Sequence, residues 1–225
     1  MARTLVLLHG FTNTGLSWEA VAAALPERYR PLAPDIRGHG AASDVRPVSL
    51  AAVIADVGAL AEGPCELAGY SMGGRLALHA AFALPGRVRR LILIGASPGL
   101  ADPAERAARR AADEALADEV EAMTIDEFAE RWARTPVLAG QPPAVLAAAL
   151  RGLGTGALPS LWERLAELAI PVELVVGERD AKFRATADQM AAALPRARVH
   201  VVPGAGHAVH LEDPRAVAGV ISRTS

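Results

Sequence analysis

Cysteine is almost absent from this chain of 225 residues, which contains Cys65 alone. A single cysteine excludes a fold stabilised by intrachain disulfide bonds. The apolar run at residues 5–8 is too short for the hydrophobic region of a secretory signal. No segment reaches the ~20 apolar residues of a membrane-spanning helix, because Asp56 interrupts the long Ala, Val and Leu segment after Leu50. We therefore expect a soluble, cytoplasmic protein.

Charge of one sign is also scarce, since the formal net charge is -2 at pH 7. The sequence has no basic stripe and no set of aromatic residues for base stacking, so we expect no nucleic-acid partner. The 6 histidines show no spacing typical of metal ligands, and we expect neither a metal nor another cofactor. The oligomeric state does not follow from the sequence.

Strand and helix patterns alternate along the chain, which predicts an α/β fold with a mostly parallel sheet and helices on both faces. The predicted strands are Leu5–Leu8, Tyr29–Ala33, Glu66–Ala68, Val88–Ile94, Val172–Val176 and Val199–Val202. Residues 100–160 differ, because they are helical in pattern, rich in Ala, Glu and Arg, and interrupted by prolines and glycines. We interpret them as a small helical cap inserted into a core of residues 1–99 and 161–225. Such a cap can cover a site and select substrates.

A serine between glycines, in the segment Gly69-Tyr70-Ser71-Met72-Gly73, follows the third predicted strand and precedes a helical pattern. This arrangement is typical of a nucleophile elbow, a sharp turn that exposes the serine hydroxyl above the sheet. Small residues at Gly69 and Gly73 would let strand and helix pass closely. The motif is short, so its partners elsewhere in the chain decide its meaning.

Two partners follow in the chain order Ser, Asp, His that is expected of α/β-hydrolases. Asp180 comes just after the strand at residues 172–176, and His207 lies in a glycine-flanked loop after the last strand. A serine hydroxyl is a poor nucleophile or base until an imidazole takes its proton, and a carboxylate orients that imidazole. We predict a catalytic triad of Ser71, Asp180 and His207.

The loop His9-Gly10-Phe11, at the end of the first predicted strand, completes the pattern. In this fold class such a loop lends a backbone N–H to an oxyanion hole, and we expect the N–H groups of Phe11 and Met72 to be its donors. Each motif alone has an ordinary interpretation, as a helix N-cap, a turn or a loop residue. Their order at successive strand ends favours the catalytic interpretation.

The other histidines and one aspartate favour structural roles. We expect His9 to brace the oxyanion loop and Asp35 with His39 to scaffold the turn after the second strand, although loop residues near a site can also contact a ligand. His210 is expected to start the final helix. His79 and His200 fall inside a predicted helix and strand.

Beyond the triad, the sequence resembles the 2-succinyl-6-hydroxy-2,4-cyclohexadiene-1-carboxylate synthases of the menaquinone pathway over nearly its whole length. The segments that carry the resemblance are Gly69–Ala77, Ser97–Leu100, Glu105–Arg109, Gly177–Phe183 and Ala205–His210. The Ser, Asp and His motifs are shared by the whole superfamily. Tyr70, Arg75, the Ser-Pro-Gly-Leu run and Arg179-Asp180-Ala181-Lys182-Phe183 are more specific.

The resemblance implies a carbon–oxygen lyase on a hydrolase scaffold. Ser71, activated by His207 and oriented through Asp180, would act as a base, and elimination would expel pyruvate from a succinylated enolpyruvyl cyclohexene carboxylate. The oxyanion hole would hold the developing enolate. The resemblance also implies that this carboxylated small molecule is bound by Tyr70, Arg75, Arg109 and Trp132.

Several alternatives stay open at this point. Arg75 either points into the pocket or pairs with an acid, and Arg109 has the i,i+4 spacing of a surface pair with Glu105. Trp132 could instead anchor the cap to the core. The same triad would also serve a serine carboxylesterase or a carbon–carbon bond hydrolase through an acyl-enzyme. An inert ligand-binding protein is a further alternative, since a fold by itself does not prove function.

Overall fold

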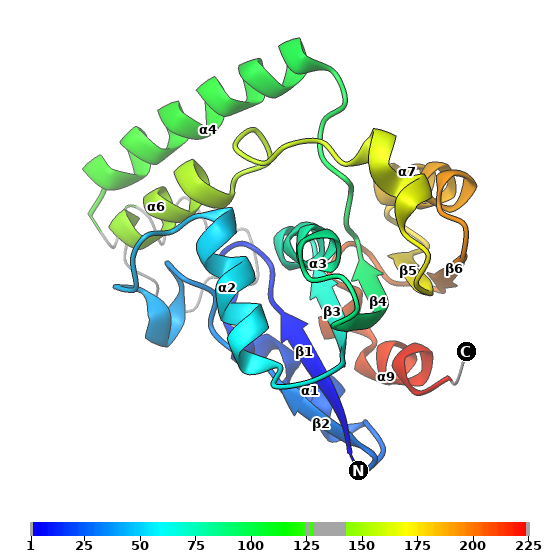
Figure 1. Ribbon diagram of the computed structural model, residues 1–225. Coiled ribbons are helices and arrows are strands. Elements are labelled where there is room, and N and C mark those ends of the chain that lie inside the picture. Colours follow the sequence, from blue (N-terminus) through cyan, green and yellow to red (C-terminus); the bar gives the residue numbers. More distant parts are fainter. Residues whose placement is uncertain (1, 125–126, 128–142, 224–225) are drawn as a thin grey trace.

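The computed structural model describes residues 2–124, 127 and 143–223, and within these residues six parallel strands form one sheet in the order β2-β1-β3-β4-β5-β6 (Figure 1). The strands are β1 (Arg3–Leu8), β2 (Tyr29–Leu32), β3 (Cys65–Tyr70), β4 (Val88–Ile94), β5 (Val172–Gly177) and β6 (Ala197–Val202). All six predicted strands are present, and their ends differ from the prediction by at most two residues. The largest difference is β3, which continues through Gly69 to Tyr70 because both residues pair with β4.

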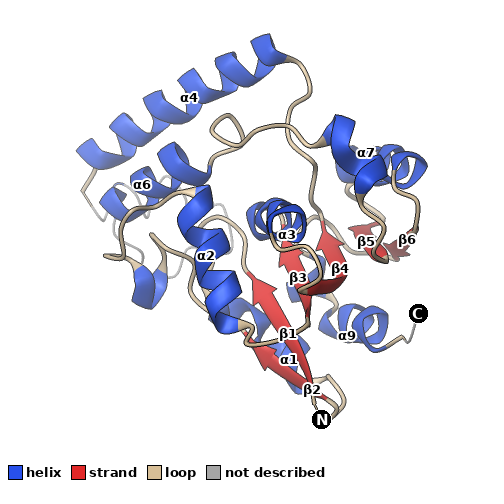
Figure 2. Cartoon of the chain, viewed as in Figure 1, coloured by secondary structure: helices blue, strands red, loops and turns tan. Residues whose placement is uncertain are grey.

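Helices cover both faces of this sheet (Figure 2). One apolar cluster joins strand residues such as Leu67 and Leu91 to α2, α3 and α7, and a second joins Ala68 and Ile92 to α1 and α9. Successive strand residues point to opposite faces, so neighbouring residues enter different clusters. The helices of these layers are α1 (Glu19–Ala23), α2 (Leu50–Leu60), α3 (Met72–Ala83), α7 (Ala181–Ala193), α8 (Val209–Glu212) and α9 (Pro214–Ser222), with 3-10 turns at Gly15–Trp18, Gly40–Ala42 and Trp162–Glu167.

Two further helices, α4 (Pro103–Ala122) and α6 (Pro143–Leu153), lie beyond the carboxyl ends of β1, β3 and β4 (Figure 1). The Asp102 side chain caps α4 by accepting from the Ala104 N–H at 2.6 Å, and Pro103 occupies the first turn. A small apolar cluster that includes Val120 and Leu146 joins the two helices. The described part of the predicted cap is therefore largely helical, and its division from the core as a separate unit stays a prediction.

The final helix is shorter than the sequence predicts. It begins at Pro214, after the Asp213 side chain accepts from the Ala216 N–H at 2.9 Å, and His210 lies in the separate short helix α8. The prediction that His210 starts the final helix is therefore wrong. An aspartate cap followed by proline is a strong helix start, and it determines where α9 begins.

A buried polar network holds α9 against the sheet. Arg90 in β4 donates to the Glu173 carboxylate at 3.1 Å and to the carbonyl oxygens of Ile221 at 2.7 Å and Val220 at 2.9 Å. His200 in β6 lies 2.6 Å from Glu173, as a satisfied histidine within a strand. Burial opposes ionisation of Glu173, but the hydrogen bonds from His200 and Arg90 outweigh it and lower the pKa of this carboxyl group.

Candidate active site

The predicted nucleophile lies at the turn between β3 and α3. Ser71 has φ 51° and ψ -108°, a backbone conformation that residues other than glycine rarely adopt. Its N–H donates to the Ile94 carbonyl at 2.9 Å. A Cβ atom at Gly69 would clash with the Gly73 backbone, and one at Gly73 would clash with the Leu8 carbonyl. The two glycines therefore permit the tight crossing that presents the Ser71 hydroxyl, as the nucleophile elbow requires.

His207 bridges the other two triad residues. Its Nε2 atom lies 3.3 Å from Ser71 Oγ, and its Nδ1 atom lies 2.6 Å from Asp180 Oδ2. The other oxygen of Asp180 accepts from the Phe183 N–H at 3.3 Å, so the carboxylate also caps α7. A backbone amide thereby fixes the group that orients the imidazole. The structure brings Ser71, Asp180 and His207 together in the arrangement that activates a serine hydroxyl.

Aromatic rings surround the imidazole of His207. The Phe183 ring centroid lies 4.5 Å from that of His207, and the Tyr70 centroid lies 5.2 Å from it. Tyr70 also packs on the buried His210 at 4.2 Å and does not line the pocket described below. Burial, reinforced by the Asp180 and Glu212 carboxylates, raises the pKa of the Tyr70 phenol. Tyr70 thus lies beneath His207, and its predicted contact with substrate stays a prediction.

The loop after β1 is held by buried polar contacts. His9 Nε2 accepts from the Ile36 N–H at 2.9 Å, and its Nδ1 donates to the Gly10 carbonyl at 2.8 Å. Burial, with the nearby His39, lowers the pKa of His9 to about 3, so the ring is neutral as these contacts require. The expectation that His9 braces this loop is confirmed. Phe11, the next residue but one, lines the pocket.

Asp35 and the remaining histidines occupy structural positions. The Asp35 carboxylate accepts from the N–H groups of Gly15 and Ala41, each at 2.7 Å, which confirms its scaffolding role. His39 is fully buried, and burial lowers its pKa to about 4. His79, within α3, has its pKa lowered to about 4, mainly by burial and also by the charge of Arg75.

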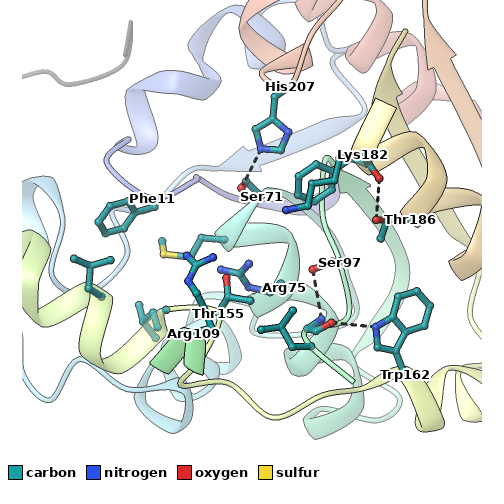
Figure 3. Close-up of a pocket in the computed structure, with 17 residues that line it drawn as sticks. Phe11, Ser71, Arg75, Ser97, Arg109, Thr155, Trp162, Lys182, Thr186 and His207 are labelled. Carbon is teal, nitrogen blue, oxygen red and sulfur yellow. Dashed lines mark hydrogen bonds between the residues drawn. The ribbon is translucent and has the colours of Figure 1, made fainter. Parts of the chain in front are cut away.

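A cavity of about 380 Å³ opens onto the serine and the imidazole (Figure 3). No aspartate or glutamate is among the described residues that line it, whereas two arginines and a lysine are. The lining residues are Phe11, Ser71, Met72, Arg75, Ser97, Gly99, Leu100, Arg109, Leu150, Leu153, Gly154, Thr155, Trp162, Lys182, Phe183, Thr186 and His207. The charge of this cavity suits an anionic ligand.

Arg75 extends into this cavity from α3, one turn after Ser71 (Figure 3). Its Nε atom is buried without a hydrogen-bond partner, and no carboxylate among the described residues forms an ion pair with it. Burial, reinforced by the like charge of Arg109 and opposed by Asp113, lowers the pKa of Arg75 to about 10. The sequence left open whether Arg75 points into the pocket or pairs with an acid, and in the structure its side chain lines the pocket.

Arg109 also lines the cavity, but its partner is not Glu105. Its Nε atom donates to Asp113 Oδ1 at 2.7 Å, one turn further along α4. Both acids have the i,i+4 spacing from Arg109, so spacing alone could not distinguish them. Trp132, the fourth predicted substrate contact, lies outside the described residues.

Sequence reasoning assigned no role to three further pocket residues. Trp162 donates from Nε1 to the Gly99 carbonyl at 3.0 Å and thereby holds the Ser97–Leu100 segment against the cavity. Lys182 and Ser97 both belong to the motifs that carried the family resemblance, which was the available signal for them. Nothing in the local sequence pattern distinguishes Trp162 from a core tryptophan.

Metal and membrane features are absent from the described part of the chain. Among residues 2–124, 127 and 143–223, no group of three or more His, Cys, Asp or Glu side chains could hold a metal ion. Within the same ranges, no helix has the length and hydrophobicity of a membrane span.

Comparison with known proteins agrees with this geometry. The α/β hydrolase family model matches residues 5–220. A putative 2-succinyl-6-hydroxy-2,4-cyclohexadiene-1-carboxylate synthase of Bacillus subtilis is 36% identical, with 98% of this chain and 89% of the relative covered. The synthase of Klebsiella pneumoniae (strain MGH 78578) is 32% identical, with 97% and 92% covered.

Solved structures give the same picture. MenH from S. aureus superposes with a TM-score of 0.90 at 29% identity, covering 97% of this chain and 91% of that one. A malate-bound thermophilic esterase from Thermogutta terrifontis superposes with a TM-score of 0.82 at 26% identity, covering 98% and 88%.

Proposed function

Since this chain belongs to the α/β-hydrolase family and, within it, to the 2-succinyl-6-hydroxy-2,4-cyclohexadiene-1-carboxylate synthases, we propose that it eliminates pyruvate from a succinylated enolpyruvyl cyclohexene carboxylate. The reaction is that of a menaquinone-pathway lyase. The observation that carries the proposal is a Ser-His-Asp triad that opens onto a cavity lined by Arg75, Arg109 and Lys182 and by no carboxylate among the described residues. A substrate with several carboxylates matches that charge.

In this reaction Ser71 acts as a base rather than as a nucleophile. Ser71 Oγ removes the proton from the ring carbon next to the succinyl carbonyl, while His207 Nε2 takes the hydroxyl proton of Ser71. The electron pair of the broken C–H bond shifts through the ring double bond and expels the enolpyruvyl oxygen by breaking its bond to the ring carbon. The ring then contains the two conjugated double bonds of the diene. The departing enolate takes the proton from His207 at carbon and becomes pyruvate. Asp180 stabilises the transient imidazolium, and its 2.6 Å contact with Nδ1 supports this role.

Negative charge develops on the succinyl carbonyl oxygen as the proton leaves. We assign its stabilisation to the backbone N–H groups of Phe11 and Met72. Met72 is the first residue of α3, and N–H groups in the first turn of a helix have no acceptor within that helix. Both residues line the cavity beside Ser71, which supports the assignment.

The substrate carboxylates are assigned to Arg75 and Arg109, with Lys182 as a third cation in the cavity lining. The unpaired buried Nε atom of Arg75 supports the first assignment, because an unsatisfied buried donor is stabilised when a ligand supplies its acceptor. Tyr70 and Trp132 stay proposed contacts on the family resemblance. We further propose that α4 and α6 form a cap that excludes water from the cavity. A cytoplasmic location stays part of this proposal.

Ester hydrolysis is the second candidate, because the same triad can form an acyl-enzyme and the structure is similar to that of the Thermogutta terrifontis esterase. One experiment separates the two reactions. The purified protein is assayed with the succinylated enolpyruvyl cyclohexene carboxylate, following pyruvate and the diene absorbance, and in parallel with p-nitrophenyl butyrate. Strong elimination that Ser71→Ala abolishes, with feeble ester cleavage, supports the lyase. Efficient ester cleavage without pyruvate release refutes it in favour of the esterase.

A further inference from the structure

Asp113 is a buried carboxylate in the middle of α4, and it is 4% exposed. Oδ1 accepts from Arg109 Nε at 2.7 Å, and Oδ2 accepts from the Gly156 N–H at 3.2 Å. A buried charge is costly unless it is paired and hydrogen-bonded, and here each oxygen has one donor. Asp113 does not line the cavity, but Arg109 and Thr155, the neighbour of Gly156, both do.

Glycines allow the second contact to form. A Cβ atom at Gly154 would lie 2.7 Å from Asp113 Oδ2, and a Cβ atom at Gly156 would clash with the Arg110 backbone. The turn at residues 154–156 therefore lies directly against α4, which brings the Gly156 N–H within reach of Asp113. One carboxylate thus connects two separate parts of the cavity wall.

The contact with Arg109 also determines which of its donors face a ligand. Because Nε is bound to Asp113, the two terminal nitrogens are left, and no hydrogen bond from them to another described residue is formed. A guanidinium held at Nε presents Nη1 and Nη2 as a fixed pair that matches the two oxygens of a carboxylate. Asp113 also lies close enough to Arg75 to offset part of the repulsion between the two arginines.

We propose that Asp113 is a positioning residue that sets the carboxylate affinity of the cavity through Arg109, because its Oδ1 atom orients the Arg109 guanidinium while its Oδ2 atom is anchored by the Gly156 N–H. The proposal rests on the proposed function in naming the carboxylated substrate. It assigns Asp113 no contact with substrate, since Asp113 acts through Arg109.

The test is a double-mutant cycle of Asp113→Asn and Arg109→Ala. Asparagine replaces one carboxylate oxygen by an NH₂ group, so one of the two donors loses its acceptor. We expect Asp113→Asn to raise KM for the carboxylated substrate about tenfold with kcat changed less than about twofold. In the Arg109→Ala background the same change should add less than about twofold, because the partner through which Asp113 acts is gone. Glu105→Gln, which removes the same charge at the exposed i−4 position of Arg109, is the matched control and should leave KM unchanged.

If Asp113 had only a structural role, its effect on KM would add fully to that of Arg109→Ala. Asp113→Asn would in that case also lower kcat or the melting temperature. That result would overturn the proposal. Arg109→Lys is a second variant, in which the cation stays but the fork orientation set at Nε is lost. Because the Arg109 side chain is half-exposed, this variant should fold normally, and it should show the same rise in KM as Asp113→Asn. An unchanged KM in Arg109→Lys would equally contradict the proposal.

A binding measurement keeps this inference separate from the proposed reaction. Calorimetric titration with 2-succinylbenzoate, an aromatic dicarboxylate with the same succinyl chain, requires no turnover. Equal affinity in the wild-type protein and Glu105→Gln, with about tenfold weaker binding in Asp113→Asn, supports the positioning role even if no pyruvate is released. Unchanged binding in Asp113→Asn refutes it even if the elimination is confirmed.

Discussion

Ser71 and His207 are 136 residues apart in the chain, yet Oγ of the serine and Nε2 of the histidine lie 3.3 Å apart. The contact joins the turn after β3 to the loop after β6, on strands that are separated in the sheet by β4 and β5. The carboxyl ends of parallel strands meet at one edge of a sheet, which is why residues so distant in sequence form one site.

The triad should act as a unit. Ser71→Ala, Asp180→Asn and His207→Ala are each expected to lower kcat for pyruvate release by about 10³-fold or more, because each removes a link in the same proton transfer. The double variant Ser71→Ala/His207→Ala should lose little beyond either single variant. Ser43→Ala, at a serine that does not line the cavity, serves as the control. Fully multiplicative losses would show that the residues act independently.

Gly73→Ala should damage both the fold and the site. The added methyl group would meet the Leu8 carbonyl, a backbone atom that cannot move without distorting β1. We expect a fall of several degrees in melting temperature together with loss of turnover. Gly219→Ala in α9 is the matched control, because nothing lies within 4 Å of its added Cβ and alanine favours the helix. Equal thermal stability of the two variants would contradict the predicted clash.

Arg75→Met should separate stability from function. The Nε atom of Arg75 is buried without a partner, and desolvation disfavours the charged form of this partly buried side chain, so an apolar side chain of similar length is expected to stabilise the fold by about 1 kcal/mol, or ~2–4 °C in melting temperature. The KM for the carboxylated substrate should rise at least about tenfold, whereas cleavage of a neutral aryl ester should change little. Thermal melts and the paired assays check both parts. Equal loss on the ester would contradict a carboxylate-binding role.

Acid should destabilise the protein through its buried histidines. Burial, reinforced by His207 and His9, lowers the pKa of His210 to about 3, whereas in the unfolded chain it protonates near the ordinary value of 6.5. Between these values the unfolded state binds more protons, so stability is present above pH 6.5 and is lost as the pH falls toward 3, by about 1.4 kcal/mol per pH unit for this group.

His210→Phe removes the titratable imidazole and keeps an aromatic ring in contact with Trp18 and Tyr70. Urea unfolding at pH 8 should show only the packing effect of the change. At pH 5 the variant should lose less stability than the wild-type protein. Identical pH dependence in the two proteins would contradict the assignment of this acid sensitivity to His210.

The sequence alone was enough to predict the strands, the sharp turn at Ser71 and the proximity of Ser71, Asp180 and His207. Those features depend on local patterns: strand-like runs end at Tyr70, Gly177 and Val202, and Ser71, Asp180 and His207 each follow one of these runs within five residues. A parallel sheet gathers such strand ends at one edge, so their order in the chain was sufficient to predict the site.

The tertiary structure decided what surrounds the triad. Arg109 has an acid one turn before it and another one turn after it, and only the packing of α4 through Ala117 and Val120 buries the second. The same packing brings the Gly156 N–H to Asp113, from a segment that no spacing in α4 predicts. Local patterns specify which side chains share a helix face, whereas contacts between segments depend on how the whole helix is oriented against its neighbours.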